Sequence, residues 1–346
     1  MTLAVAWVRE VGAGPEMLFA SDSRLRQGGA WDTCPKLFKL PRSDALMAFA
    51  GDTLWAYPIV LQTINDVEAF PPSRRRQSDL RVARGHALRV INQMLRSGDA
   101  VSGGLHVPDT EFLLGGWSWE AQRFLLWRFH WNTHDHAFRH ETIVRQRIGL
   151  VRFIGDRDVE DPARDLVGIA KQRLYDLLAQ RGKTQGPLDM EPFEILVAML
   201  RTNSHETIGG PPQLAKVYRH MNAQFFAITW PNGEGVPTLA GRELLDYEQL
   251  EVPVLNPDNP TMLPVQARKL PRTQNLSSTD SLLLPAIEGL GAPTAFELLE
   301  WSETHAYGFT HDDVEAWLED AEHRGLVRAV EEGRVELAEF PRESTE

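Results

Sequence analysis

Thr2 is the residue of this chain whose type and position most directly suggest chemistry. It follows the initiator Met1 and precedes a short apolar run at residues 3–7. Removal of Met1 would leave Thr2 with a free α-amine beside its hydroxyl. An α-amine with a pKa of roughly 7.7–8.0 is a competent base at neutral pH, so one residue would supply both nucleophile and base. Many proteins begin Met-Thr, so this interpretation depends on the residues that follow.

Two other groups of reactive side chains have simpler interpretations. Cys34 is the single cysteine, which excludes an internal disulfide framework and favours a reducing cytoplasm. A cluster of metal-ligand residue types surrounds a predicted hairpin turn, so its side chains need not converge as a zinc site requires. The cluster consists of His130, His134, Asp135, His136 and His140. We expect neither a metal nor a cofactor.

The charge of the chain is unevenly distributed. The formal net charge of the 346 residues is −12, and residues 280–346 alone hold 17 acidic and 4 basic side chains, a net of −13. The rest of the chain is therefore close to neutral, which indicates a boundary between two differently built parts. No apolar run approaches the roughly 20 residues that span a bilayer, and the N-terminus lacks the pattern of a signal peptide. We expect a cytoplasmic protein.

Hydrophobic periodicity predicts an α+β fold over residues 1–250. A helix is expected to begin at an Asp52-Thr53 cap and to run to Glu68, with Pro58 inside it. Further helices are predicted at 79–97, 161–181 and 190–202. Strands are predicted at 3–8, 17–22, 36–40, 45–50, 111–117, 122–130, 137–144, 149–154, 213–219 and 223–230. Two helical layers enclosing two sheets would bury these segments.

The C-terminal third has a different pattern. Residues 251–279 contain five prolines and are predicted to form a linker. Helices are expected at about 280–290, 294–305 and 311–324, followed by a hairpin at 326–337, which together suggest a winged-helix-like module. The helix at 311–324 is strongly acidic and would repel nucleic acid, which favours a protein partner.

The order of several short motifs resembles the proteasome-like N-terminal-nucleophile (Ntn) hydrolases, including HslV and the bacterial Anbu group. The resemblance covers about residues 2–230 and implies a four-layer αββα sandwich. Its motifs are the opening strand at 2–6, Ala-Ser-Asp-Ser-Arg at 20–24, Lys-Leu-Phe-Lys-Leu at 36–40, Ala-Gly-Asp-Thr at 50–53 and Ile-Gly-Gly-Pro at 208–211.

The resemblance assigns roles to four residues. Thr2 would be the nucleophile, Lys36 a cation that lowers the pKa of its amine, and Asp22 the partner that orients Lys36. The N–H group of Gly51 would donate to the developing oxyanion. Asp156 departs from the pattern, because a serine normally supports the amine there. A nearby carboxylate would raise the pKa of the amine.

The leading prediction is a threonine peptidase or amidohydrolase that acts on peptides or unfolded protein. By resemblance the subunit would form a homo-oligomer, such as a ring, and the acidic module would bind a protein partner. The alternative is a catalytically inactive proteasome-like scaffold or sensor, which retention of Met1 would favour. A regulator that binds nucleic acid through the acidic module is a third and weaker alternative.

Overall fold

The chain forms two compact units, Met1–Pro264 and Val265–Glu346. The computed structural model describes residues 2–337 except for the following gaps. These are 12–13, 27–28, 103–108, 158–160, 163, 184, 203–204, 220, 246–247, 249–251, 261–277, 305–308, 325 and 331–332.

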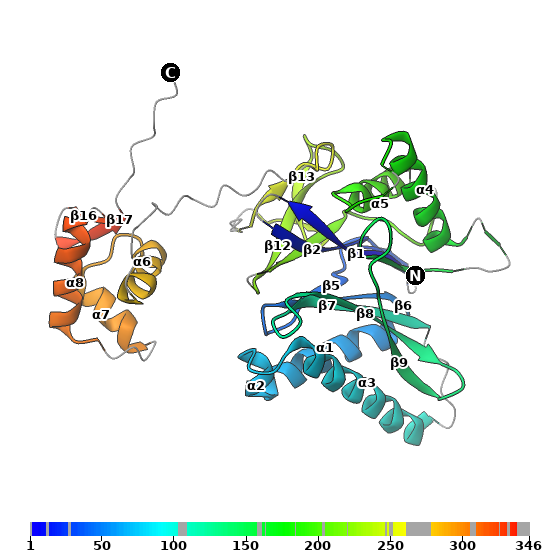
Figure 1. Ribbon diagram of the computed structural model, residues 1–346, viewed down its shortest axis with the longest axis horizontal. Coiled ribbons are helices and arrows are strands. Elements are labelled where there is room, and N and C mark those ends of the chain that lie inside the picture. The colour runs from blue at the N-terminus through cyan, green and yellow to red at the C-terminus, as the bar shows by residue number, and fades with distance from the viewer. Residues whose placement is uncertain are drawn as a thin grey trace. The chain divides into compact units, whose positions relative to one another are not determined.

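The first unit is built on two sheets (Figure 1). The larger sheet has the order β10-β1-β2-β11-β12-β13-β14, and β15 pairs with β12. Its strands are β1 (Leu3–Val11), β2 (Gly14–Ser21), β10 (Val151–Gly155), β11 (Gln213–Tyr218), β12 (Ala223–Trp230), β13 (Val236–Leu239), β14 (Arg242–Glu243) and β15 (Val254–Leu255). Neighbouring strands are antiparallel except for the β12–β15 pair.

The second sheet is antiparallel and has the order β5-β6-β7-β8-β9. Its strands are β5 (Leu37–Lys39), β6 (Ala45–Gly51), β7 (Thr110–Ser118), β8 (Arg123–Asn132) and β9 (Ala137–Thr142). A small separate hairpin, which the sequence did not predict, joins β3 (Leu25–Arg26) to β4 (Ala30–Trp31).

Helices cover the outer face of each sheet (Figure 1). The helices on the second sheet are α1 (Thr53–Ala69), α2 (Pro71–Arg74) and α3 (Leu80–Ser102), and those on the larger sheet are α4 (Leu166–Gln180) and α5 (Glu191–Thr202). Asp52 caps α1 as expected, because its carboxylate accepts a hydrogen bond from the N–H of Leu54. The helix continues through Pro58. The prediction placed the start of α4 five residues too early, because Asp165 caps that helix.

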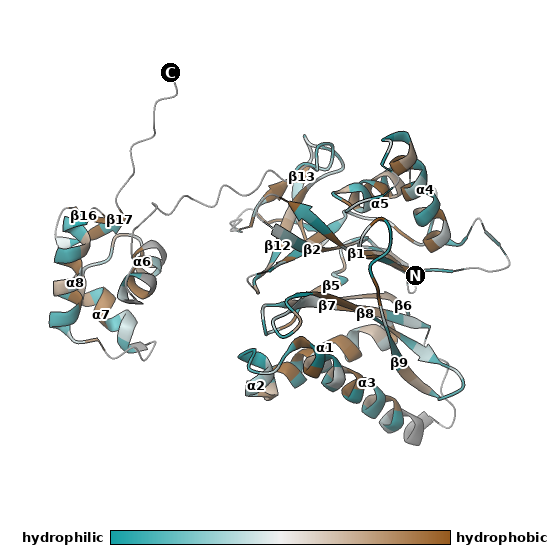
Figure 2. Cartoon of the chain, in the orientation of Figure 1, coloured by the Kyte–Doolittle hydropathy of each residue, from teal (hydrophilic) through white to brown (hydrophobic). Residues whose placement is uncertain are grey.

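Apolar residues, brown in Figure 2, lie along the strands of the first unit, and strand β1 is a buried example. Its residues 3–7 are all fully buried. Leu3, Val5 and Trp7 pack in a core with α4 and α5, whereas Ala4 and Ala6 pack in a second core between the two sheets. This alternation follows the two-residue period of a strand. A third core lies between the second sheet and helices α1 and α3.

The Pro-rich range 251–279 is not a linker along its whole length. Val254–Leu255 form β15 and pair with Ala227 and Ile228 of β12. The side chain of Leu255 is buried in the core beside α5, which explains why this part joins the first unit. The range 261–277 lies outside the described residues.

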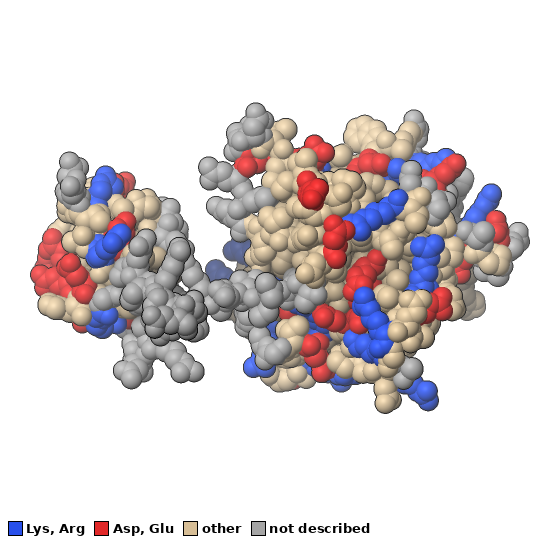
Figure 3. Space-filling view, turned by 90° about the horizontal axis from the view of Figure 1, so that it is seen from above, with Lys and Arg blue, Asp and Glu red and all other residues tan. Residues whose placement is uncertain are grey.

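The second unit contains three helices and a hairpin, in the predicted order. These elements are α6 (Ser278–Leu290), α7 (Ala295–Thr304), α8 (His311–His323), β16 (Val327–Ala329) and β17 (Val335–Leu337). Leu283, Leu298 and Val314 are fully buried in its core. Buried Asp280 accepts hydrogen bonds from Trp317 and Arg324. Acidic side chains gather on one side of the visible face of this unit (Figure 3).

None of the described helices is long and apolar enough to cross a membrane.

Candidate active site

Two neighbouring strands place Thr2 and Asp22 next to each other. Thr2 immediately precedes β1 and Asp22 immediately follows β2, and these strands pair antiparallel with Ala4 opposite Ser21. The start of one strand therefore lies beside the end of the other. The N–H of Leu3 donates to Asp22 Oδ1 over 3.2 Å, and the N–H of Asp22 donates to the Leu3 carbonyl over 3.3 Å.

Lys36 connects these two residues. It immediately precedes β5 and is fully buried, as are Thr2 and Asp22. Its Nζ atom donates to Thr2 Oγ1 over 2.8 Å and to Asp22 Oδ1 over 2.9 Å. The structure thus brings together three of the residues that the sequence singled out. Their catalytic roles remain predictions.

The electrostatics of the site depend on burial. Loss of solvation lowers the pKa of Lys36, and the carboxylates of Asp22 and Asp156 oppose this effect. The Asp22 carboxylate is fixed by four donors, since Oδ1 also accepts from Leu3 and Oδ2 accepts from the N–H groups of Arg24 and Gly209. A carboxylate held in this way presents Lys36 with a fixed partner.

Asp156 lies directly against Thr2. It follows β10, whose Gly155 is opposite Leu3, and its N–H donates to the Thr2 carbonyl over 3.3 Å. In return the Thr2 nitrogen donates to Asp156 Oδ1 over 3.3 Å. Burial raises the pKa of Asp156, against the opposing effects of a side-chain hydrogen bond with Thr207 and of the hydrogen bond from Thr2.

Gly51 lies at the end of β6, before the Asp52 cap of α1. It is opposite Thr110, and its φ of +106° is a conformation that favours glycine. A Cβ atom at this position would lie 2.0 Å from the Asp109 carbonyl oxygen. These contacts explain why glycine is needed at the junction, and its proposed role toward an oxyanion stays a prediction.

Gln213 is a positioning residue that the sequence analysis missed. It begins β11, is almost fully buried, and its Oε1 accepts from the N–H of Lys36 over 3.0 Å. Its Nε2 donates to the Asp22 carbonyl, to Ser23 Oγ and to the Cys34 carbonyl. One amide therefore joins the segments that carry Asp22 and Lys36. The only signal in the sequence is a lone amide at the start of an apolar strand.

The Gly-Gly-Pro turn is also tied to the site. Arg24 forms a two-pronged ion pair with Asp32 and donates to the carbonyls of Glu206 and Ile208. A Cβ atom on Gly209 would lie 2.3 Å from Arg24 Cζ, so a larger residue here would displace the Arg24 guanidinium from its present position. In this turn the Gly209 N–H donates a hydrogen bond to Asp22 Oδ2.

Three solved structures to which the chain is similar have the same description, Anbu. The chain is similar in structure to Anbu proteins. A Gly-1 mutant of Anbu from Hyphomicrobium sp. strain MC1 is 16% identical, with a TM-score of 0.42 over 65% of this chain and 85% of that chain. Anbu from Yersinia bercovieri, described as an ancestral beta-subunit, is 16% identical, with a TM-score of 0.41 over 62% and 81% of the two chains.

A third Anbu structure, from Pseudomonas aeruginosa, is described as a helical assembly of the Anbu complex. It is 14% identical, with a TM-score of 0.47 over 67% of this chain and 88% of that chain. No family model matches the sequence, and no curated protein matches it either.

The remaining candidate groups are the histidine cluster and Cys34. His134 lies in the turn between β8 and β9, where its N–H donates to Asn132 Oδ1. The His140 ring lies 3.1 Å from Arg84 Nη1. The described residues include no group of three or more His, Cys, Asp or Glu placed to hold a metal ion. Cys34 is buried, which raises the pKa of its thiol and disfavours the reactive thiolate.

Proposed function

We propose that the first unit is a threonine-type Ntn amidohydrolase with a four-layer αββα arrangement. One observation carries the proposal: the fully buried Lys36 Nζ contacts both Thr2 Oγ1, at 2.8 Å, and Asp22 Oδ1, at 2.9 Å. Burying a lysine is costly unless it is paired and hydrogen-bonded. A buried cation on a threonine hydroxyl is the arrangement expected around an activated nucleophile.

The reaction begins after Met1 is removed. Thr2 Oγ1 attacks the carbonyl carbon of an amide, and its proton passes to the Thr2 α-amine. The oxyanion that forms accepts a hydrogen bond from the Gly51 N–H. Collapse of the intermediate breaks the C–N bond, and the ammonium returns the proton to the leaving amine. Water then cleaves the ester on Thr2 Oγ1 and regenerates the free threonine.

Lys36 and Asp156 would act on Thr2 in opposite directions. The positive charge of Lys36 lowers the pKa of a nearby amine and stabilises the attacking oxygen. A carboxylate at Asp156, hydrogen-bonded to the Thr2 nitrogen over 3.3 Å, raises the pKa of that amine. The balance between them would set the pH at which the amine is a free base.

The substrate and the assembly are part of the same proposal. The site would cleave peptides or unfolded protein in the cytoplasm. Leu54 and Leu61 of α1, seven residues apart on one helical face, are 66% and 55% exposed. Exposed apolar side chains at this spacing support an interface between copies of the chain. The copies would form a homo-oligomer such as a ring.

The second unit would be a winged-helix-like module that binds a protein partner. Its hairpin is extended by a β-bridge between Thr294, before α7, and Arg334, before β17. This bridge places the segment before α7 beside the hairpin, which supports a winged-helix-like arrangement. The acidic α8 supports a basic protein surface as partner rather than nucleic acid.

Two measurements on the purified protein test the hydrolase. Intact mass spectrometry reports whether Met1 is removed, and a threonine-reactive β-lactone probe reports whether Thr2 is nucleophilic. We expect one probe per mature chain, no labelling of Thr2→Ala, and retained labelling of Thr2→Ser. Retention of Met1 in every preparation, or equal labelling of Thr2→Ala, would contradict the hydrolase and favour the inactive scaffold.

A further inference from the structure

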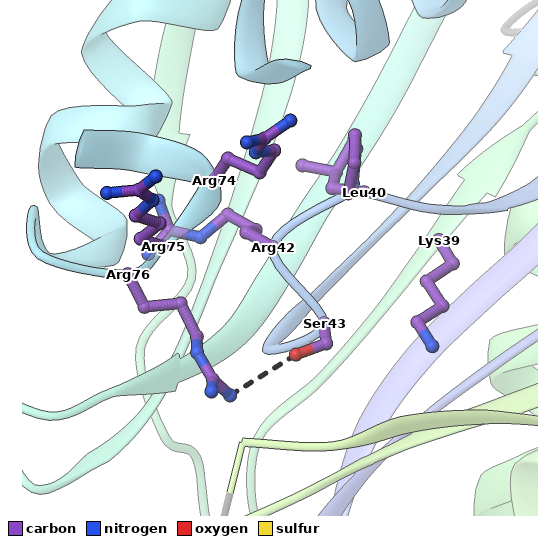
Figure 4. A pocket seen from close by; sticks show the side chains of 8 residues that line it. Lys39, Leu40, Arg42, Ser43, Arg74, Arg75 and Arg76 are labelled. Carbon is purple, nitrogen blue, oxygen red and sulfur yellow. Dashed lines mark hydrogen bonds between the residues drawn. The ribbon is translucent and has the colours of Figure 1, made fainter. Parts of the chain in front are cut away.

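A cationic hollow lies on the first unit, formed by the turn between β5 and β6 and by the end of α2 (Figure 4). Its volume is about 410 Å³, within the range of small-molecule sites. Five of its eight lining residues are basic and none is acidic or aromatic. The lining consists of Lys39, Leu40, Pro41, Arg42, Ser43, Arg74, Arg75 and Arg76.

Most of this positive charge is not neutralised. Fully buried Arg42 is balanced by fully buried Asp44. Arg74 lies 3.4 Å from Glu68, but both side chains are about half exposed, so this pair is weak. Exposed Lys39 and Arg75 form no ion pair with a described residue. The hollow therefore keeps an excess of positive charge, although the whole chain carries a net charge of −12.

Three non-glycine residues at or next to the hollow have a left-handed backbone conformation. Ser43, Arg76 and Met221 all have positive φ angles, of 58°, 58° and 64°. Arg76 Nη1 donates to Ser43 Oγ and to the Met221 carbonyl, and Ser43 Oγ donates to the same carbonyl. Non-glycine residues rarely adopt this conformation, and when they do so they often lie at functional sites. Here the two hydrogen bonds from Nη1 fix the position of the Arg76 guanidinium.

We propose that this hollow binds a compact polyanion that carries several phosphate groups. Arginine guanidinium groups match phosphate oxygens with paired hydrogen bonds. The small volume favours a short phosphate chain over an extended acidic peptide. The absence of an aromatic side chain from the lining means that a nucleoside base attached to the phosphates would gain no stacking contact.

Titration calorimetry of the full-length protein with sodium tripolyphosphate, at low salt, tests the site. We expect saturable one-to-one binding that Arg75→Glu and Lys39→Glu each weaken at least tenfold. Both side chains are exposed, so neither change disturbs the core. Arg147→Glu is the matched control, because Arg147 is also exposed but lies outside the hollow. It should change the affinity less than twofold.

Two further ligands, ATP and citrate, test whether the hollow recognises a phosphate chain, a nucleoside or any polyanion. ATP should bind within about threefold of tripolyphosphate if only the phosphate chain makes contacts, and citrate should bind at least tenfold more weakly. An absence of saturable binding would overturn the proposal, as would equal weakening by Arg75→Glu and Arg147→Glu. Citrate as strong as tripolyphosphate would overturn the phosphate assignment, and ATP tenfold stronger would overturn recognition of the phosphate chain alone.

Discussion

Lys36 and Arg75 are both cations of the first unit, but their surroundings are opposite. Lys36 is fully buried and contacts a carboxylate and a hydroxyl, whereas Arg75 is exposed and pairs with no described carboxylate. A buried cation must be compensated within the fold, since its solvation has been lost. An exposed cation keeps its water and can exchange it for an outside anion. Replacing the buried lysine should therefore lower the free energy of unfolding, whereas replacing the exposed arginine should leave it almost unchanged.

The largest effect is expected for Lys36→Met. This change leaves Asp22 fully buried without its cation, and removal of one partner of a buried pair costs about 3–5 kcal/mol. Urea unfolding of the first unit measures the loss. If Lys36→Met lowers the free energy of unfolding by less than about 1 kcal/mol, the buried Lys36 does not support the fold as proposed.

A smaller loss is expected for Gln213→Leu. The leucine removes the donor for the Asp22 and Cys34 carbonyls and the acceptor for the Lys36 N–H. Buried groups left without partners cost about 1–3 kcal/mol, so we expect about 2 kcal/mol in the same urea assay. Gln224→Leu is the matched control in the next strand and should cost less than about 1 kcal/mol. Equal losses would show that Gln213 has no special positioning role.

Asp156→Asn should change stability in a pH-dependent way. Burial raises the pKa of Asp156, so the folded state favours its protonated form and loses stability as pH rises through that pKa. The asparagine side chain in Asp156→Asn does not ionise, so the variant does not lose stability in this way as pH rises. We expect Tm to rise by about 2–4 °C at pH 7, the effect of roughly 1 kcal/mol in a domain of this size, and to be unchanged at pH 3.

Thermal unfolding at the two pH values provides the measurement. Asp176→Asn, at an exposed position of α4, is the control and should show no such difference. A larger gain at pH 3 than at pH 7 would reverse the sign and rule out the explanation.

The smallest effect is expected for Arg75→Met. Exposed side chains without ion pairs change stability by no more than about 0.5 kcal/mol when replaced. Urea unfolding of Arg75→Met and Lys36→Met under the same conditions measures the free energy of unfolding that each change costs. A loss above about 1.5 kcal/mol would show that Arg75 supports the fold, and the contrast between the two cations would fail.

Local patterns anticipated many of the elements of the first unit. The apolar run at residues 3–7 predicted a strand because both of its faces are covered, one by helices and one by the second sheet. Asp52 predicted the start of α1 because a cap acts within one turn of the chain. The strand β15 was missed because prolines surround it and its burial depends on contacts with β12.

The sequence by itself determined the order of the elements and the identities of Thr2, Asp22 and Lys36 as candidates. Strand and helix patterns are local, and short motifs keep their order along the chain. Only the tertiary structure brought these side chains within 3 Å of Lys36 Nζ. It also decided that Gln213, almost two hundred residues from Asp22, joins their segments, because a hydrogen bond over that separation leaves no periodic signal in the sequence.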